Sequence, residues 1–146
     1  MTATERTSAA SPALSDKARR FLEAPRFAVV AVLNPDGSPL QAVVWYVIEG
    51  DVIVFNSRMG RQWPTNLQRD RRLSFTVADG YEYVEMRGEV DIDEDPIRSQ
   101  DVIAGLARRY HTDRESADAQ IAAFAKQSRV TFIFRPTRIF ERLSGK

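Results

Sequence analysis

The sequence of 146 residues contains no cysteine and only one histidine, His111. Without cysteine, the chain can form no disulfide bond, no thiolate metal site and no cysteine nucleophile. His111 has no second histidine and no carboxylate cluster to complete a metal site or a catalytic triad. We therefore predict no metal site. We expect His111, Arg108 and Arg109 to cap the C-terminal end of their own helix, where the helix dipole favours cations.

Glycine-rich motifs and long apolar runs are also absent. The glycines are isolated, and neither a dinucleotide fingerprint nor a P-loop can be written through them, so classical nicotinamide binding and nucleotide hydrolysis are disfavoured. No apolar run is long enough to span a bilayer, and residues 1–12 lack the apolar core of a signal peptide. We expect a cytoplasmic protein with no membrane partner, and the cysteine-free composition agrees with a reducing compartment.

The composition is that of an ordinary soluble protein, with 43% hydrophobic residues, 28% charged residues and a formal net charge of +1. A charge this small gives no overall attraction to nucleic acid or to a membrane surface, so any anion recognition is local. The length fits one domain with a real core. We expect this domain over residues 14–146, after a flexible tail over residues 1–13 whose small polar side chains cannot bury enough surface to fold.

Apolar runs bounded by turn residues predict a domain rich in β-structure. The predicted strands cover residues 27–33, 41–48, 52–57, 73–78, 83–92 and 130–134. The predicted helices cover residues 15–23, 96–110 and 115–126, and a short helix has Pro64 at its first position. Successive strands are joined by short turns, and Asn34-Pro35-Asp36-Gly37 has the residues of a type I turn. The sequence therefore predicts an α+β fold, a small six-stranded antiparallel barrel with a few peripheral helices.

Three features refine this picture. Gly88 interrupts the alternating strand 83–92 and indicates a β-bulge or a close approach of two backbones. Pro136 limits any continuation of the last strand to an edge or a bend. The strand 41–48 is apolar on both faces, so both faces are covered. Because few helices are available as the second cover, we expect a homodimer.

The segment 56–72 joins a predicted strand to the short helix and is rich in arginine and in hydrogen-bonding side chains. A strand-to-helix junction offers free backbone N–H groups that suit a phosphate, and Arg58 and Arg61 can clamp one. Neutral hydrogen-bonding groups are added by Ser57, Gln62, Thr65 and Asn66. A solvated turn followed by a polar helix explains the same residues, so both interpretations stay open.

Aromatic residues near this segment offer a pocket for a flat ring, and they are Trp45, Tyr46, Trp63, Tyr81 and Tyr83. Packing in a core or an interface is the commoner role of each. A chain poor in acid–base groups, with an anion clamp beside aromatic strands, suits chemistry carried by a bound cofactor, because the protein then supplies orientation and electrostatics. Hydride transfer of the flavin kind fits this description.

Four segments together carry a resemblance to a known family, and they are Asn34–Pro39, Trp45-Tyr46, Asn66–Asp70 and Tyr83–Gly88. From about Ser15 to Phe140 the chain resembles the split β-barrel flavin and deazaflavin oxidoreductases related to pyridoxamine 5′-phosphate oxidase. It is most similar to the branch that uses coenzyme F420. The resemblance implies a homodimer with two cofactor sites at the subunit interface.

The resemblance also implies roles for individual residues. The cofactor phosphate would be held just before Asn66, by Ser57, Arg58, Arg61 and Gln62. The ring would lie near Val43, Trp45 and Asn56. The partner subunit would contribute Tyr81, Tyr83 and Arg129. Tyr83 is our candidate for a substrate contact or catalytic proton donor, a role in which an ordinary phenol is a poor acid.

Position 63 departs from the family pattern. Relatives that bind the deazaflavin usually carry a lysine three residues before the asparagine, and this chain has Trp63 there. An indole can stack on a ring but cannot neutralise a phosphate. Either Arg58 or Arg61 takes over this charge, or the site has changed its ligand.

The leading hypothesis is therefore an oxidoreductase that transfers a hydride between F420 and a small electrophilic organic substrate. FMN, as in the oxidase relatives, is the alternative cofactor. A different class of function is a protein that binds the cofactor, or a tetrapyrrole such as haem or biliverdin, without turnover. A nucleic-acid module that uses the arginines of segment 58–72 is a fourth interpretation, disfavoured because the net charge is near zero.

Overall fold

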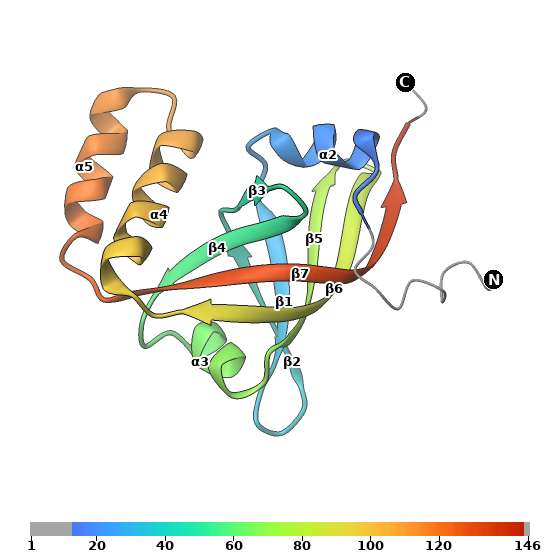
Figure 1. The fold of residues 1–146 in the computed structure, drawn as a ribbon, viewed down its shortest axis with the longest axis horizontal. Helices are drawn as coiled ribbons and strands as arrows, with labels where there is room; N and C mark the ends of the chain where they lie inside the picture. The colour runs from blue at the N-terminus through green and yellow to red at the C-terminus, as the bar shows by residue number, and fades with distance from the viewer. Residues whose placement is uncertain (1–12, 145–146) are drawn as a thin grey trace.

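The computed structural model describes residues 13–144, which form four helices and seven strands (Figure 1). In chain order these are α2 (Asp16–Glu23), β1 (Ala28–Leu33), β2 (Pro39–Val44), β3 (Val47–Glu49), β4 (Val52–Arg58), α3 (Gln62–Arg69), β5 (Arg72–Asp79), β6 (Glu82–Asp93), α4 (Pro96–Tyr110), α5 (Arg114–Phe124) and β7 (Arg129–Arg142). Of the predicted flexible tail over residues 1–13, all but Ala13 lies outside the described residues.

The strands form one antiparallel sheet in the order β2-β1-β5-β6-β7-β4-β3. Its two edge strands, β2 and β3, are consecutive in the chain and are separated only by Trp45 and Tyr46. Two residues span a few ångströms at most, so the sheet has to curl until its edges meet. The result is the half-barrel seen in Figure 1, and the predicted antiparallel α+β fold is confirmed.

The predicted count of six strands is wrong, because the expected strand 41–48 is broken into β2 and β3 at Trp45 and Tyr46. Side chains of α4 replace the missing sheet partners at this corner. The Tyr46 N–H donates to the Tyr110 hydroxyl at 3.2 Å, and the Tyr46 carbonyl accepts from Arg109 Nε at 2.9 Å. The backbone polar groups are therefore satisfied outside the ladder, which lets the chain leave one edge and join the other.

Gly88 lies at a β-bulge, as predicted. The register between β6 and β7 shifts between Arg87 and Gly88, opposite Pro136, and a Cβ on Gly88 would lie 2.8 Å from the Arg135 carbonyl oxygen. Only glycine therefore allows the two backbones to approach so closely. Strand β7 continues through Pro136 at this irregularity.

Two other local predictions can be compared with the structure. The turn after β1 closes as expected, with the Gly37 N–H donating to the Asn34 carbonyl at 2.9 Å and Gly37 at φ +88°. The predicted position of Pro64 is wrong by two residues, because α3 already begins at Gln62. A proline in the first turn still costs no intrahelical hydrogen bond, since the first N–H groups of a helix have no partner in it.

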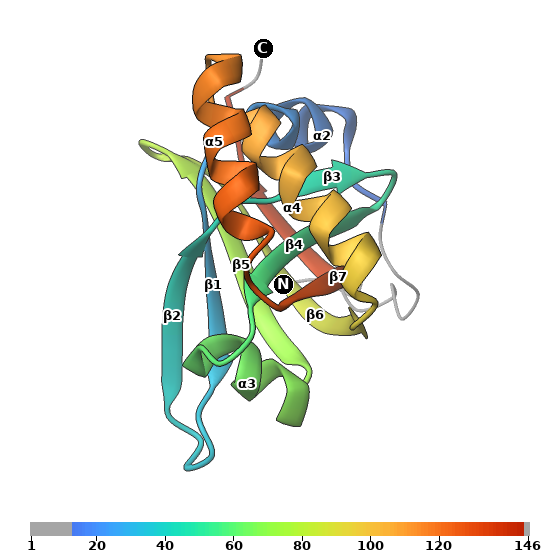
Figure 2. The ribbon, with the colours of Figure 1, turned by 90° about the vertical axis from the view of Figure 1, so that its left-hand side faces the viewer.

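The inner face of the curled sheet is filled by large apolar side chains, which include Tyr46, Phe55, Phe75, Phe132 and Phe134. Helix α2 packs at one end of the sheet and α3 lies at the other (Figure 1). Helices α4 and α5 form a hairpin that stands against β4 and β7 (Figure 2). Within residues 13–144, no helix combines the length and the apolar character needed to cross a lipid bilayer.

Candidate cofactor site

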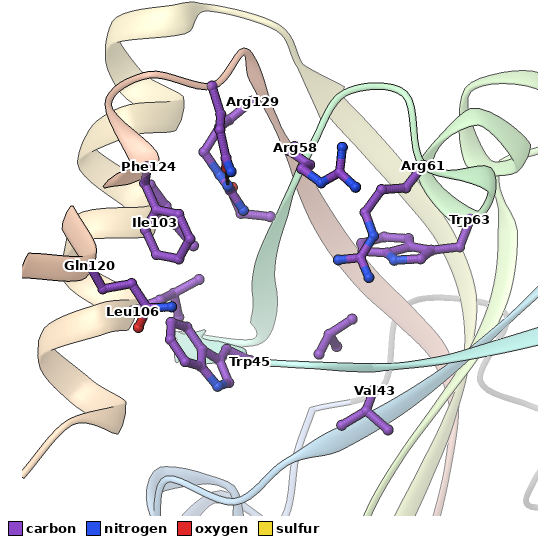
Figure 3. Close-up of a pocket in the computed structure, with 13 residues that line it drawn as sticks. Val43, Trp45, Arg58, Arg61, Trp63, Ile103, Leu106, Gln120, Phe124 and Arg129 are labelled. Atoms are coloured by element: carbon purple, nitrogen blue, oxygen red, sulfur yellow. Dashed lines mark hydrogen bonds between the residues drawn. The ribbon is translucent and has the colours of Figure 1, made fainter. Parts of the chain in front are cut away.

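A cavity of about 290 Å³ opens where the end of β4, the start of α3 and the α4–α5 hairpin meet the corner between β2 and β3 (Figure 3). Its walls come from β2 and the corner after it, from β4, α3, α4 and α5, and from the start of β7 with the residues just before it. The lining residues are Val43, Val44, Trp45, Asn56, Arg58, Arg61, Trp63, Ile103, Leu106, Gln120, Phe124, Gln127 and Arg129. The cavity is therefore a product of the tertiary fold and not of any single loop.

Three arginines line the cavity without a carboxylate to neutralise them. Arg58 and Arg129 are directly opposite each other in the ladder between β4 and β7, and Arg61 is the N-cap residue of α3. No carboxylate within residues 13–144 pairs with any of the three. Like charges at directly opposed positions of a sheet repel. Burial, with the charges of Arg61 and Arg58, lowers the pKa of Arg129 to about 10. The arrangement favours a bound anion.

Arg129 is held in place by neutral side chains. Its Nε donates to Asn56 Oδ1 at 2.7 Å, its Nη1 donates to Gln127 Oε1, and its guanidinium carbon lies 4.5 Å from the centre of the Phe124 ring. None of these contacts cancels the positive charge. Arg129 is thus a fixed, partly buried cation on the wall of the cavity.

The side of the cavity across from Arg58 and Arg61 is aromatic and aliphatic, as Figure 3 shows, and Arg129 packs on its Phe124. Trp45 stacks on Tyr110 with ring centres 5.2 Å apart and an angle of 8°, and it meets the edge of Phe124 at 6.3 Å. Ile103 and Leu106 of α4 complete this wall. A ligand with an anionic group at one end and a flat apolar ring at the other matches both sides.

Part of the predicted site comes together in this cavity. Its lining includes these predicted residues: Val43, Trp45, Asn56, Arg58, Arg61 and Arg129. The family resemblance assigned Arg129 to the partner subunit, whereas here it lines the same cavity as Arg58 and Arg61 of its own chain. The three arginines therefore come together within a single chain.

Three predicted phosphate ligands have other partners. The Ser57 hydroxyl is buried and donates to the Arg58 carbonyl at 2.9 Å. Gln62 Nε2 donates to Asn66 Oδ1 at 2.8 Å, and Asn66 Nδ2 donates to Asn34 Oδ1 at 2.9 Å. Asn66 is completely buried, so its amide ties α3 to the turn after β1. These residues support the loop that carries Arg58 and Arg61, and none of them lines the cavity.

The two predicted tyrosines lie away from the cavity of their own chain. Tyr81 sits in the turn between β5 and β6 with 91% of its surface exposed. Tyr83 is on β6 and packs beside Phe140, with ring centres 5.9 Å apart. Their role in a partner's site, which the resemblance implies, stays a prediction.

The basic group at the end of α4 has a different role from the one expected. Arg109 donates to the carbonyls of Leu22, Glu23 and Ala24, at the C-terminal end of α2, as well as to Tyr46. The prediction that it caps its own helix is therefore wrong, although the attraction of a cation to a helix C-terminus holds for α2.

Sequence reasoning missed the wall built by the α4–α5 hairpin. The missed residues are Ile103, Leu106, Gln120, Phe124 and Gln127. The apolar periodicity of the sequence in α4 and α5 indicates that Ile103, Leu106 and Phe124 are packing residues, without indicating a cavity. His111 hydrogen-bonds Gln120 and so supports this wall from behind. Among residues 13–144 there is no group of three or more His, Asp or Glu side chains placed to hold a metal ion.

Comparisons with known proteins identify the family and the fold. Residues 14–142 match the family model described as pyridoxamine 5′-phosphate oxidase. A solved structure named F420 reductase is 26% identical over 87% of this chain and 98% of its own, with a TM-score of 0.69. A conserved hypothetical protein from Mycobacterium tuberculosis is also 26% identical, over 90% of this chain and 86% of its own, with a TM-score of 0.73.

A more distant structure shares the fold alone. It is a putative pyridoxamine 5′-phosphate oxidase from Listeria innocua, 16% identical over 88% of this chain and 98% of its own, with a TM-score of 0.66. A search of curated proteins finds no match.

Proposed function

Because the chain belongs to the pyridoxamine 5′-phosphate oxidase family, whose members are generally oxidoreductases, we propose that it binds coenzyme F420 and transfers a hydride between that cofactor and a small electrophilic organic substrate. The observation that carries the proposal is the cluster of Arg58, Arg61 and Arg129, which has no carboxylate partner within residues 13–144 and faces an aromatic wall. When bound, the reduced deazaflavin would supply the hydride, and a proton from water or from Tyr83 of the partner chain would complete the reduction of the substrate.

The arginines would bind the cofactor phosphate. Arg129 is oriented by Asn56 and Gln127, while Arg58 is exposed and can adjust to the ligand. Guanidinium groups form charge-assisted and often bidentate hydrogen bonds with phosphate oxygens. This chemistry fits any cofactor with a phosphate at the end of a flexible chain.

Trp45 would give the ring a flat apolar surface. Its stacking on Tyr110 fixes the indole plane, because a rigid neighbour removes rotamer freedom. Phe124 and Leu106 exclude water from the same wall. These residues orient the ring, and the cofactor supplies the chemistry.

The proposal includes a homodimer with a second chain beside the cavity. Phe27, Val29 and Val43 are apolar and stay on the surface of the single chain, and Val43 has 68% of its surface exposed at the cavity edge. A second copy that covers these residues would enclose the ring and bring the partner's aromatic residues to it, with Tyr81 and Tyr83 as the candidates. Tyr83 would then be the substrate contact or proton donor. The cysteine-free chain suits a reducing compartment, and we propose the cytoplasm.

FMN is the second candidate cofactor, and the family name favours it as much as the neighbouring F420 reductase favours the deazaflavin. Trp63 does not decide between them. Its indole is 5% exposed and packs against Phe55 and Phe132 in the core, so it replaces the expected lysine without supplying charge. Arg58, Arg61 and Arg129 would supply that charge for either cofactor.

The test is a titration of purified protein with F420 and with FMN. The protein is produced in a host that makes FMN but not F420, so a yellow product indicates FMN and a colourless one is titrated with F420 while tryptophan fluorescence is followed. Trp45 in the cavity wall should be quenched by a bound ring. Binding of neither cofactor would overturn the proposal.

Turnover separates an enzyme from a cofactor carrier. The reduced complex is mixed with a panel of quinones, enones and tetrapyrroles, and oxidation of the cofactor is recorded. We expect at least one class to be reduced in a protein-dependent way. A complex that binds F420 tightly but reduces none of them would support the carrier or tetrapyrrole-binding function.

A further inference from the structure

Both amide hydrogens of the Asn56 side chain, and one of the two lone pairs of its Oδ1, are used inside the protein. Its Nδ2 donates both to Thr131 Oγ1, at 3.0 Å, and to the Ser99 carbonyl, at 3.1 Å. Its Oδ1 accepts from Arg129 Nε at 2.7 Å. Asn56 is only 8% exposed, and Thr131 and Ser99 are buried as well. Although Asn56 lines the cavity, it has no amide hydrogen left to offer a ligand.

Arg129, in contrast, is incompletely used. Asn56 and Gln127 accept from its Nε and Nη1, and no acceptor for its Nη2 is found within the described residues 13–144. The acceptor Asn56 is itself held by Thr131 and by Ser99 of α4, so the hydrogen-bond network that supports Arg129 extends to α4. The guanidinium group of Arg129 is planar, so it cannot change its orientation without breaking its hydrogen bonds to Asn56 and Gln127.

We infer that Asn56 is a positioning residue, which does not touch the cofactor but holds Arg129 in the orientation in which its remaining donor group binds the cofactor phosphate. This inference rests on the proposed function. It changes the role predicted for Asn56, which was expected to bind the cofactor directly.

The benefit of this arrangement is preorganisation. An unsupported arginine loses rotamer freedom when it binds an anion, whereas Arg129 is already ordered by Asn56 and Gln127. Arg58 and Arg61 have no side-chain hydrogen bond to residues 13–144 and lack such support. The geometry therefore assigns Arg129 the task of fixing the phosphate, with Arg58 and Arg61 closing on it.

The first measurement tests orientation without any cofactor. In protein labelled with ¹⁵N-arginine, the Arg129 Nε–H proton should exchange slowly with water, because it is partly buried and bonded to Asn56. In Asn56→Leu, which keeps the branched shape but removes the acceptor, exchange should be at least about tenfold faster. Ser99→Ala is the matched control, because it removes a buried hydroxyl from the network and leaves the carbonyl that Asn56 contacts. Unchanged exchange in Asn56→Leu would overturn the inference.

The second measurement is a double-mutant cycle on binding of F420, FMN and inorganic phosphate. Asn56→Leu should weaken binding about tenfold, the worth of one charge-assisted hydrogen bond. In the Arg129→Gln background the same change should alter binding less than about twofold, because Asn56 acts through Arg129. An equal loss in both backgrounds would mean that Asn56 contacts the ligand itself or supports the fold generally, and would overturn the inference.

Asn56→Asp provides a variant that keeps the acceptor for Arg129. It should retain slow exchange of the Nε–H proton but weaken phosphate binding, since the new carboxylate neutralises the cation. Unchanged phosphate binding in this variant would contradict the assigned geometry, because a carboxylate beside Arg129 competes with the phosphate. If the wild type binds neither F420 nor FMN, the proposed function fails, while the exchange measurement and the phosphate cycle still decide the role of Asn56.

Discussion

Arg109 and Arg129 are both partly buried arginines beside aromatic rings, yet their hydrogen bonds differ. Arg109 lies 5.3 Å from the Tyr46 ring centre, and all three of its nitrogen atoms donate to main-chain carbonyls. Arg129 lies 4.5 Å from the Phe124 ring centre, but its acceptors are two neutral amides. Every guanidinium nitrogen of Arg109 has an acceptor in the protein, whereas Nη2 of Arg129 has none among residues 13–144.

The difference separates Arg109, which supports the fold, from Arg129, for which we propose a role in ligand binding. The carbonyls around Arg109 belong to the C-terminal end of α2 and to the corner at Tyr46, so they carry partial negative charge toward the cation. Around Arg129, the nearest charges are the like charges of Arg58 and Arg61, which help burial to lower its pKa. A folded protein keeps such a repulsive group where a ligand makes use of it.

The strongest way to break the comparison is to remove Arg109. Arg109→Met keeps the apolar stem but removes a charged donor from four carbonyls, three of which keep a neutral donor, and we expect the free energy of unfolding to fall by about 3 kcal/mol. Urea denaturation measures this change. Arg108→Met, on the exposed side of the same helix, is the control and should change stability by less than about 0.5 kcal/mol. Equal effects of the two variants would mean that Arg109 is not a structural anchor.

Removing Arg129 should have the opposite pattern. Arg129→Gln should weaken binding of F420 or FMN about 30-fold, near 2 kcal/mol, while the stability of the cofactor-free protein changes by less than about 1 kcal/mol. Repulsion from Arg58 and Arg61 is relieved, which offsets the lost hydrogen bonds. The matched control is Arg135→Gln on the same strand, whose arginine pairs with Asp91 at 3.0 Å outside the cavity. A large loss of stability in Arg129→Gln, with the affinity for the cofactor unchanged, would contradict the comparison.

Tyr46, at the corner beside Arg109, should make the stability of the protein depend on pH. Burial is the main cause that raises the pKa of Tyr46 to about 12. In the unfolded chain the phenol ionises near pH 10, so the stability that depends on the neutral Tyr46 is fully present below pH 10 and is lost as the pH rises toward 12.

The size of this loss is about 1.4 kcal/mol by pH 11, for a pKa difference of two units. Arg129, with its lowered pKa, contributes with the opposite sign between pH 10 and 12.5, so we compare the wild type with Tyr46→Phe at each pH. The stability advantage of the wild type should shrink between pH 9 and pH 11. A constant difference would show that Tyr46 ionises equally in both states.

The smallest expected effect belongs to Arg58. Its side chain is exposed, so water and salt screen its attraction to a phosphate, and Arg58→Gln should weaken cofactor binding about threefold at low salt. The difference should vanish near 0.5 M salt. Arg72→Gln, an exposed arginine that pairs with Asp70 outside the cavity, is the control. A loss as large as that of Arg129→Gln would remove the ranking of the two arginines.

Local sequence signals were sufficient for most of the fold. The alternation of β6, the turn at Asn34–Gly37 and the bulge at Gly88 depend on residues close together in the chain, and the structure confirms them. The break at Tyr46 was missed because its backbone partners, Arg109 and Tyr110, lie more than 60 residues away. No pattern within the strand 41–48 records those partners.

The candidate site divides in the same way. Arg58 and Arg61 are three residues apart in the sequence at a strand-to-helix junction, so their proximity follows from local structure. The wall that contains Leu106 and Phe124 depends on how the α4–α5 hairpin docks, and their apolar periodicity indicates burial without saying against what. The state of the Asn56 amide is likewise a property of the folded neighbours.

The two-residue corner at Trp45 and Tyr46 has a consequence for how binding and folding are linked. Val43 belongs to β2, the first strand in the sheet order, and Asn56 belongs to β4, the sixth. They become neighbours only after the sheet has curled and its ends have been joined. A chain with an open sheet lacks this cavity, so binding of the proposed cofactor would stabilise only molecules whose sheet has closed.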